Sequence, residues 1–320
     1  MIKKILVPLD RSYFAEQALA EASVLARRLK ASLRLLLVHQ PVPYAGFEDV
    51  PWYQDEASVE REYLATMLKE LADTGIAGTS TILRGNPARL IWQEAERSGC
   101  DLIVMTSHGR TGLNRMWLGS VADAVIRHST TPVLMIRPTD HEDPHRKSVA
   151  AVKRILITLD GSALSRNVLP TATDLAKCTG AAVTLLTVIQ PVPWIPPVTN
   201  MPFAFSPVAY DESVTKELVS AAEKDLAAEK AILEKTIVSV DTSVVIAPSV
   251  AHAITECIHS KQIDLVAMST HGRGASRYLL GSVADKIIRA SDKPVLLYHA
   301  EAEVFDDDPA EEEEPELVAL

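Results

Sequence analysis

The sequence DLIVMTSHGRTGLNRMWLGSVADAVIRHST, residues 101–130, joins a short apolar run to a glycine-bearing loop and then to a helix. The run Leu102–Met105 has no polar alternation, which is typical of a strand covered on both faces of a parallel sheet. Gly109 lets the backbone approach a ligand closely. At Gly119-Ser120 the helix offers free N–H groups and a positive dipole end to an anion, and the Ser120 hydroxyl is suited to cap it. This order of elements predicts a phosphate site.

The same stretch occurs a second time. Residues 264–293 read DLVAMSTHGRGASRYLLGSVADKIIRASDK. Nearer the start, KKILVPLDRS at 3–12 matches KRILITLDGS at 153–162. A period near 150 residues is that of a duplicated domain rather than of a solenoid unit.

Within one domain, apolar strands alternate with amphipathic helices, which predicts a parallel sheet with right-handed crossovers. In the first copy we expect strands at 5–9, 33–38, 79–83, 102–105 and 133–137, and helices that follow the first four of them, among them one at 58–73 and one at 120–129. Ligands of such sheets bind beyond the carboxyl ends of the strands. Asp10, which follows the first strand, is therefore expected at the same edge as the glycine loop.

Charge is concentrated at the end of the chain. The 320 residues have a net charge of −10, and residues 301–320 hold ten acidic and no basic residues. Residues 1–300 hold the other 32 of the 42 acidic residues and all 32 Lys and Arg residues, so this part of the chain is formally neutral. A neutral body lacks the basic excess of a nucleic-acid-binding surface. We expect the acidic tail to be disordered, with a role in interactions as the alternative.

Three isolated cysteines, an amino terminus without a signal peptide and the lack of a long apolar run predict a cytoplasmic protein with no membrane segment. The segments 40–53 and 190–210 hold eight of the sixteen aromatic residues. They are expected either to form a lid or partner-binding surface, or to pack over the sheet edge or against the other half.

The two copies resemble the nucleotide-binding loop of universal stress proteins, written G-x-x-G, nine residues, then G-[ST]. In the first copy Gly109 and Gly119-Ser120 match, and Thr106 occupies the place of the first glycine. The second copy departs further from the pattern. Gly272 and Gly281-Ser282 match there, Ser269 stands in for the first glycine, and only eight residues intervene.

The resemblance implies two tandem Rossmann-like α/β domains of the adenine nucleotide alpha hydrolase-like kind. Each would be a five-stranded parallel sheet of order 3-2-1-4-5 with helices on both faces. The expected divisions are domains at 1–140 and 153–300, a linker at 141–152 and the acidic tail at 301–320. The resemblance also implies pairing of the domains along the fifth-strand edge. The two halves would then form an internal pseudo-dimer, and a homodimer of chains is a further expectation.

The resemblance assigns nucleotide-binding positions in both halves. The candidate residues are Asp10, Val38, Met105, Thr106, His108, Gly109, Arg110, Gly119, Ser120, Val121, Asp160, Val188, Met268, Ser269, His271, Gly272, Arg273, Gly281, Ser282 and Val283. For the two aspartates the alternative is a turn or helix-cap carboxylate. Each histidine is either a phosphate contact or general base, or a loop residue bonded to local backbone. Each arginine is either a phosphate partner or a solvated charge.

The expected function is that of an ATP-binding regulator of the stress response, with ATP alone or with Mg²⁺ as ligand and unidentified protein targets. No catalytic residue is assigned, since neither a Walker lysine motif nor a cysteine–histidine pair with catalytic spacing occurs. The metal-holding carboxylate and water-positioning group that ATP hydrolysis needs are not evident either. Two alternatives stay open: a slow ATPase, and an interaction scaffold that has lost nucleotide binding.

Overall fold

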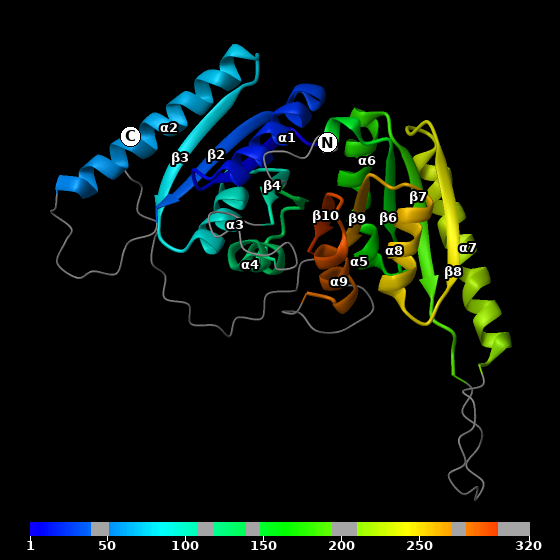
Figure 1. The fold of residues 1–320 in the computed structure, drawn as a ribbon. Coiled ribbons are helices and arrows are strands. Elements are labelled where there is room, and N and C mark those ends of the chain that lie inside the picture. The colour runs from blue at the N-terminus through cyan, green and yellow to red at the C-terminus, as the bar shows by residue number, and fades with distance from the viewer. Residues whose placement is uncertain (40–50, 108–117, 139–147, 194–209, 271–279, 300–320) are drawn as a thin grey trace, which may run out of the picture.

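The computed structural model describes residues 1–39, 51–107, 118–138, 148–193, 210–270 and 280–299, with only the secondary structure given for 51–57 and 150. It contains one sheet of ten strands, ordered β3-β2-β1-β4-β5-β10-β9-β6-β7-β8 (Figure 1). Each half therefore has the order 3-2-1-4-5 that the family resemblance implies. Pairing is parallel within each half, and the two halves meet where β5 and β10 pair antiparallel.

The two halves have the same order of elements, except that two helices, α5 and α6, take the place of α1 in the second half. The first half comprises β1 (Lys4–Leu9), α1 (Tyr13–Leu29), β2 (Ser32–His39), α2 (Pro51–Asp73), β3 (Gly78–Arg84), α3 (Pro87–Arg97), β4 (Leu102–Thr106), α4 (Ser120–His128) and β5 (Val133–Ile136). The second half follows a short 3-10 turn, η1 (Val149–Ala151), and comprises β6 (Arg154–Thr158), α5 (Ala163–Arg166), α6 (Leu169–Thr179), β7 (Ala182–Ile189), α7 (Glu212–Leu233), β8 (Val240–Ile246), α8 (Val250–Ser260), β9 (Leu265–Ser269), α9 (Ser282–Ala290) and β10 (Val295–Tyr298).

Helices cover both faces of the sheet. Residues of α1, α2, α6 and α7 share one apolar core with one face of the strands, and residues of α3, α4, α8 and α9 share a second core with the other face. In α1 the apolar face expected from sequence packs inward, since Ala18, Ala22, Leu25 and Ala26 are at most 1% exposed. The central strands β4 and β9 are buried along almost their whole length because each face of the sheet has its own helical layer.

Two expectations about local structure were wrong. Helix α2 begins at Pro51 rather than near residue 58, so Trp52 and Tyr53 belong to a helix and not to a loop. Proline is favoured at a helix start because the missing N–H has no acceptor there, so a proline-rich stretch can open a helix. Ser120 is the first residue of α4, and the cap is Gly119, which makes no side-chain hydrogen bond.

Contacts on both sides of the sheet hold the two halves together. The β5–β10 register pairs Met135 with Val295 and Leu134 with Leu296. Arg137, which follows β5, donates from Nε to the Ser291 carbonyl oxygen at 3.0 Å and from Nη2 to the Ile288 carbonyl oxygen at the end of α9. On the opposite helical layer, the Ile2 amide donates to Asp174 of α6 at 2.9 Å.

The end of the predicted linker is also fixed. Val149 and Val152 are buried at 1% and 4% exposure. The Glu21 carboxylate of α1 accepts hydrogen bonds from the Ser148 hydroxyl at 2.6 Å and the Val149 amide at 2.7 Å. The last residues before the second half are thus packed against the first half. The linker's earlier residues, 141–147, and the acidic tail lie outside the described residues.

Candidate functional site

A cavity of about 990 Å³ lies at the carboxyl ends of the second-half strands. Its lining includes Asp160 after β6, Val188 of β7, Met268 of β9 and the first residues of α9 from Gly281 onwards. The volume falls at the upper end of the range for small-molecule sites. The position is the one expected for ligands of a parallel α/β sheet, where the strand order changes direction.

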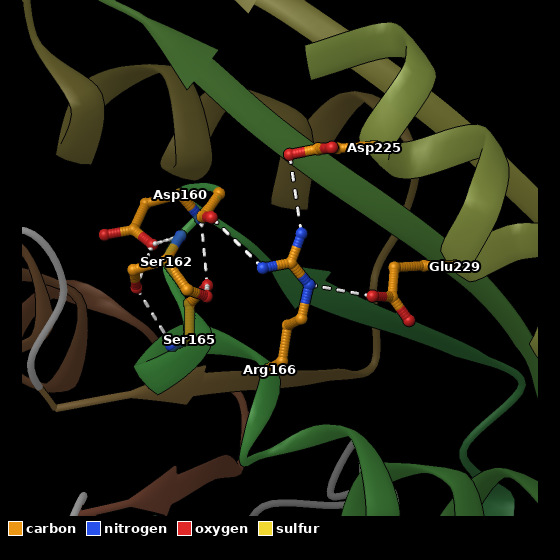
Figure 2. A network of polar contacts seen from close by, with 7 residues as sticks. Asp160, Ser162, Ser165, Arg166, Asp225 and Glu229 are labelled. Atoms are coloured by element: carbon orange, nitrogen blue, oxygen red, sulfur yellow. Dashed lines mark hydrogen bonds and ion pairs between the residues drawn. The ribbon is translucent and has the colours of Figure 1, made fainter. Parts of the chain in front are cut away.

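The loop after β6 is held by hydrogen bonds within the chain. One oxygen of Asp160, Oδ1, accepts from the Ser162 amide at 2.9 Å and from its hydroxyl at 2.6 Å (Figure 2). The Ser162 hydroxyl in turn accepts from the Ser165 amide at 3.1 Å and so caps α5. Asp160 therefore acts as a turn carboxylate, which was one of its two expected roles, and it also lines the cavity.

Strand β7 extends beyond its neighbour at this edge. The pairing of β6 with β7 ends at Thr158 and Leu186, whereas β7 continues beside β8 as far as Ile189. Val188 lies in this extension and lines the cavity. Since the strand passes the end of β6, its backbone is placed where a planar ring can reach main-chain polar groups, with Met268 and Ile254 as apolar lining.

The opposite wall is the start of α9. Its cap is Gly281, with φ −56 and no side-chain hydrogen bond. The Gly281 amide donates to the Thr270 carbonyl oxygen at 2.9 Å, and a Cβ on Gly281 would lie 2.5 Å from that same oxygen. Only glycine fits this approach without movement of the backbone. Ser282 and the next residues line the cavity at the amino terminus of α9, which carries free amides and the positive end of the helix dipole.

Sequence reasoning missed one group beside the cavity. Arg166 of α5 pairs through Nε with Glu229 at 2.8 Å and through Nη2 with Asp225 at 3.4 Å, both on α7 (Figure 2). Its Nη1 donates to the Gly161 carbonyl oxygen at 3.1 Å. Arg166 therefore ties the loop after β6 to α7. The partners are more than fifty residues away in sequence, so no local pattern indicates the contact.

The first half repeats the loop after its first strand. Asp10 Oδ1 accepts from the Ser12 amide at 3.0 Å and from its hydroxyl at 2.5 Å, and Ser12 caps α1. The backbone between them has φ 65 at Arg11, where the second half has Gly161 with φ 85. Both values lie in the left-handed region, which a side chain disfavours.

Two further pairs of first-half residues lie near this edge. The Tyr63 hydroxyl of α2 donates to Glu16 at 3.1 Å. Burial raises the pKa of that hydroxyl above its ordinary value and the Glu16 carboxylate raises it further, so Tyr63 stays a donor. His39, at the end of β2, lies 3.1 Å from Glu60 of α2, and both side chains are buried.

The remaining predicted site residues fall into two groups. Val38 lies on β2, Met105 and Thr106 end β4, Gly119 caps α4, Ser120 and Val121 begin it, and Ser269 and Val283 hold the matching places in the second half. The Ser269 hydroxyl donates to the Tyr298 carbonyl oxygen at 3.1 Å. The loop residues His108, Gly109, Arg110, His271, Gly272 and Arg273 lie outside the described residues.

The described part of the chain offers little redox or metal chemistry. Cys100 and Cys257 are buried, Cys178 is partly buried, and burial raises the pKa of Cys100 and of Cys178 to about 11. These thiols are protonated at neutral pH and react slowly. Within the described ranges no three His, Cys, Asp or Glu side chains gather as metal ligands do, and no helix has the length and apolar character to cross a bilayer.

Comparison with known proteins agrees with this architecture. The model of the universal stress protein family matches residues 1–137 and 151–299. The universal stress protein YxiE of Bacillus subtilis (strain 168) is 34% identical over 148 residues, which covers 43% of this chain and 100% of that protein. The universal stress protein MJ0531 of Methanocaldococcus jannaschii is 32% identical over 146 residues, covering 44% of this chain and 86% of its own.

Among solved structures, a universal stress protein from Archaeoglobus fulgidus DSM 4304 matches with a TM-score of 0.67 at 21% identity. The match covers 92% of this chain and 98% of the other, so both halves and their arrangement are similar in fold. The family model accounts for each half separately, on either side of the segment 138–150. The chain therefore belongs to the universal stress protein family, as a tandem of two domains.

Proposed function

We propose that this protein binds an adenine nucleotide, ATP alone or with Mg²⁺, and acts as a cytoplasmic regulator of the stress response rather than as an enzyme. The observation that carries the proposal is the cavity of about 990 Å³ in the second half. It places a carboxylate, an extended strand end and a helix amino terminus around one space.

Each wall suits one part of the nucleotide. Backbone groups near Val188, with the apolar Met268, suit the adenine ring. The Asp160 carboxylate suits the ribose hydroxyls, which are hydrogen-bond donors. The amides at the start of α9, from Gly281 to Val283, suit the phosphates, because a helix amino terminus binds anions. The nucleotide would lie across the carboxyl ends of β7, β6 and β9.

Calorimetric titration of the purified chain with ATP tests the proposal and counts the sites. We expect saturable binding, weakened about tenfold by Asp160→Ala because the ribose contact is lost. Ser162→Ala is the matched control: it removes the hydroxyl hydrogen bond to Asp160 but keeps the amide hydrogen bond and the carboxylate, so ATP affinity should change much less. The pair Asp10→Ala and Ser12→Ala asks the same question of the first half.

A glycine substitution is less informative, since a side chain at Gly281 would strike the Thr270 carbonyl oxygen with or without a ligand. Absence of saturable ATP binding at millimolar concentration would refute the proposal and favour the interaction scaffold. Release of phosphate that disappears with a single side-chain substitution would contradict the regulatory role and support the slow ATPase.

A further inference from the structure

The second-half cavity is not built from the second half alone. Arg127 of α4, a first-half residue, is one of the side chains that line it. Its guanidinium holds Asp123 on the same helix, with Nε to Oδ2 at 2.8 Å and Nη2 to Oδ1 at 3.0 Å. The duplicated counterparts in α9 are Arg289 and Asp285, which pair at 2.9 Å.

The antiparallel junction explains how Arg127 reaches the other half. Helix α4 connects the parallel strands β4 and β5, so it runs back toward the amino-terminal edge of the first-half strands, and Arg127 is in its last turn. Because β10 is antiparallel to β5, that edge adjoins the carboxyl edge of the second-half strands. Figure 1 shows α4 and α9 at the middle of the sheet, where the two halves meet, and residues of both helices belong to the apolar core on one face of the sheet.

The charges around Arg127 come from both helices. Its hydrogen bond to Asp123 raises the pKa of Arg127 above its ordinary value, and the nearby charge of Asp285 adds to this effect. With Arg289, the four groups form a cluster of two cations and two anions at the junction, which has no net charge. Side chains four residues apart on a partly exposed helix face form only weak ion pairs. An incoming phosphate can therefore replace Asp123 as the partner of Arg127.

The order of the strands sets the direction of a bound nucleotide. Strand β7 carries Val188, β9 leads to the start of α9, and β10 and β5 come next in the sheet. A nucleotide with its base near β7 and its first phosphate at α9 directs its remaining phosphates toward the junction. An arginine is suited to receive them, because its planar fork binds two phosphate oxygens at once.

We propose that Arg127 of the first half completes the second-half site by binding the terminal phosphates of the nucleotide. This inference rests on the proposed nucleotide binding and adds a specificity: the second half would prefer ATP over ADP, and ADP over AMP, and the preference would depend on the other half of the chain.

The test measures the affinity for ATP, ADP and AMP in an Asp10→Ala background, which weakens any binding to the first half and so favours the second-half site in the measurement. Arg127→Ala should weaken ATP binding about tenfold, because a charged hydrogen bond is lost and an acidic excess is left at the junction. AMP binding should hardly change. Arg127→Lys should restore only part of the ATP affinity, since an ammonium group cannot make the two parallel bonds.

Two matched variants separate this role from structural effects. Asp123→Asn breaks the same ion pair but leaves Arg127, so ATP affinity should stay equal or rise. Lys286→Ala removes one positive charge from an exposed position of α9 that does not line the cavity, and affinity should stay unchanged.

The outcomes also distinguish this inference from the proposed function. Absence of ATP binding in the unmodified chain refutes nucleotide binding itself. Normal ATP binding that Arg127→Ala leaves intact, an equal loss for AMP, or an equal loss in Asp123→Asn or Lys286→Ala overturns the role of Arg127 alone.

Discussion

At the end of the first strand of the first half, the Tyr63 hydroxyl donates to Glu16, whereas at the aligned place of the second half Arg166 pairs with two carboxylates of α7. The turns beneath them are alike, since Asp10 and Asp160 make the same contacts with the following serine. Duplication has preserved the backbone of the loop and changed the side chains above it. Since the two loops share a backbone but carry different side chains beside it, we expect the two halves to differ in the ligands they prefer.

A second difference lies beneath the strands. Glu94 of α3 is 1% exposed and accepts hydrogen bonds from Arg34 at 2.9 Å, Arg97 at 2.6 Å and the Ser98 hydroxyl at 2.6 Å. The residues of the second half that align with Arg34 and Glu94 are Thr184 and Cys257, so both positions of the ion pair carry uncharged side chains there. The first half thus depends on charge where the second half does not.

The largest effect is expected at this buried charge. Glu94→Ala should lower the free energy of unfolding by about 3–5 kcal/mol, because Arg34 is left without its carboxylate partner. Cys257→Ala, the matched change in the second half, should cost only about 1 kcal/mol. Chemical denaturation measures the loss in free energy of unfolding for each variant, and hydrogen exchange read by mass spectrometry shows which half is destabilised. Equal losses would show that the charge does not distinguish the halves.

The contact between the halves should rank next. Arg137 caps the end of α9, and its aligned residue His299 instead lies 3.0 Å from the Thr270 hydroxyl within its own half. Arg137→Ala should cost about 2 kcal/mol, because acceptors at the junction lose a charged donor. Hydrogen exchange should speed up in α9 more than in α4. Faster exchange in α4 alone would contradict the assignment of this contact.

Much of the fold was accessible from sequence, because the observed strands begin and end within one residue of the expected limits in the first half. Alternating buried runs and glycine turns carry that information locally. The start of α2 was missed because Pro51 follows a proline-rich stretch that is typical of a loop. The buried Glu94 and the position of Arg127 were missed for another reason. Their surroundings come from distant strands and from the antiparallel junction, which no local spacing encodes.

Acidification should destabilise the first half more than the second, with a smaller difference than the substitutions above produce. Burial alone would raise the pKa of Glu94, but hydrogen bonds from Ser98, Arg97 and Arg34 outweigh it and hold the pKa below its ordinary value. A lowered pKa means that the stabilisation is present above the pKa of the unfolded state and is lost as the pH falls through the folded one. First-half amides should therefore lose protection in acid before second-half amides do. In Glu94→Gln this difference should vanish; its persistence would point to other carboxylates.

The smallest change is expected at the left-handed residue of each loop. Arg11→Gly should stabilise the first half by about 0.5 kcal/mol. The change relieves the strain of a side chain at φ 65, and the greater entropy of glycine in the unfolded chain offsets only part of that gain. Gly161→Ala should cost the second half about 1 kcal/mol for the converse reason. Denaturation midpoints compare the two. Destabilisation by Arg11→Gly would mean that the Arg11 side chain contributes more than its backbone strain removes.

The antiparallel pairing of β5 with β10 has a consequence for how such a protein diverges. In an assembly of identical subunits, every substitution appears at all sites together, and dilution separates the subunits. Here the partners are encoded in tandem at a fixed one-to-one ratio and stay joined at any concentration. A substitution can then change the ligand affinity of one half while the other half keeps its own. One molecule can therefore respond to two ligands, or to two concentration ranges of the same ligand.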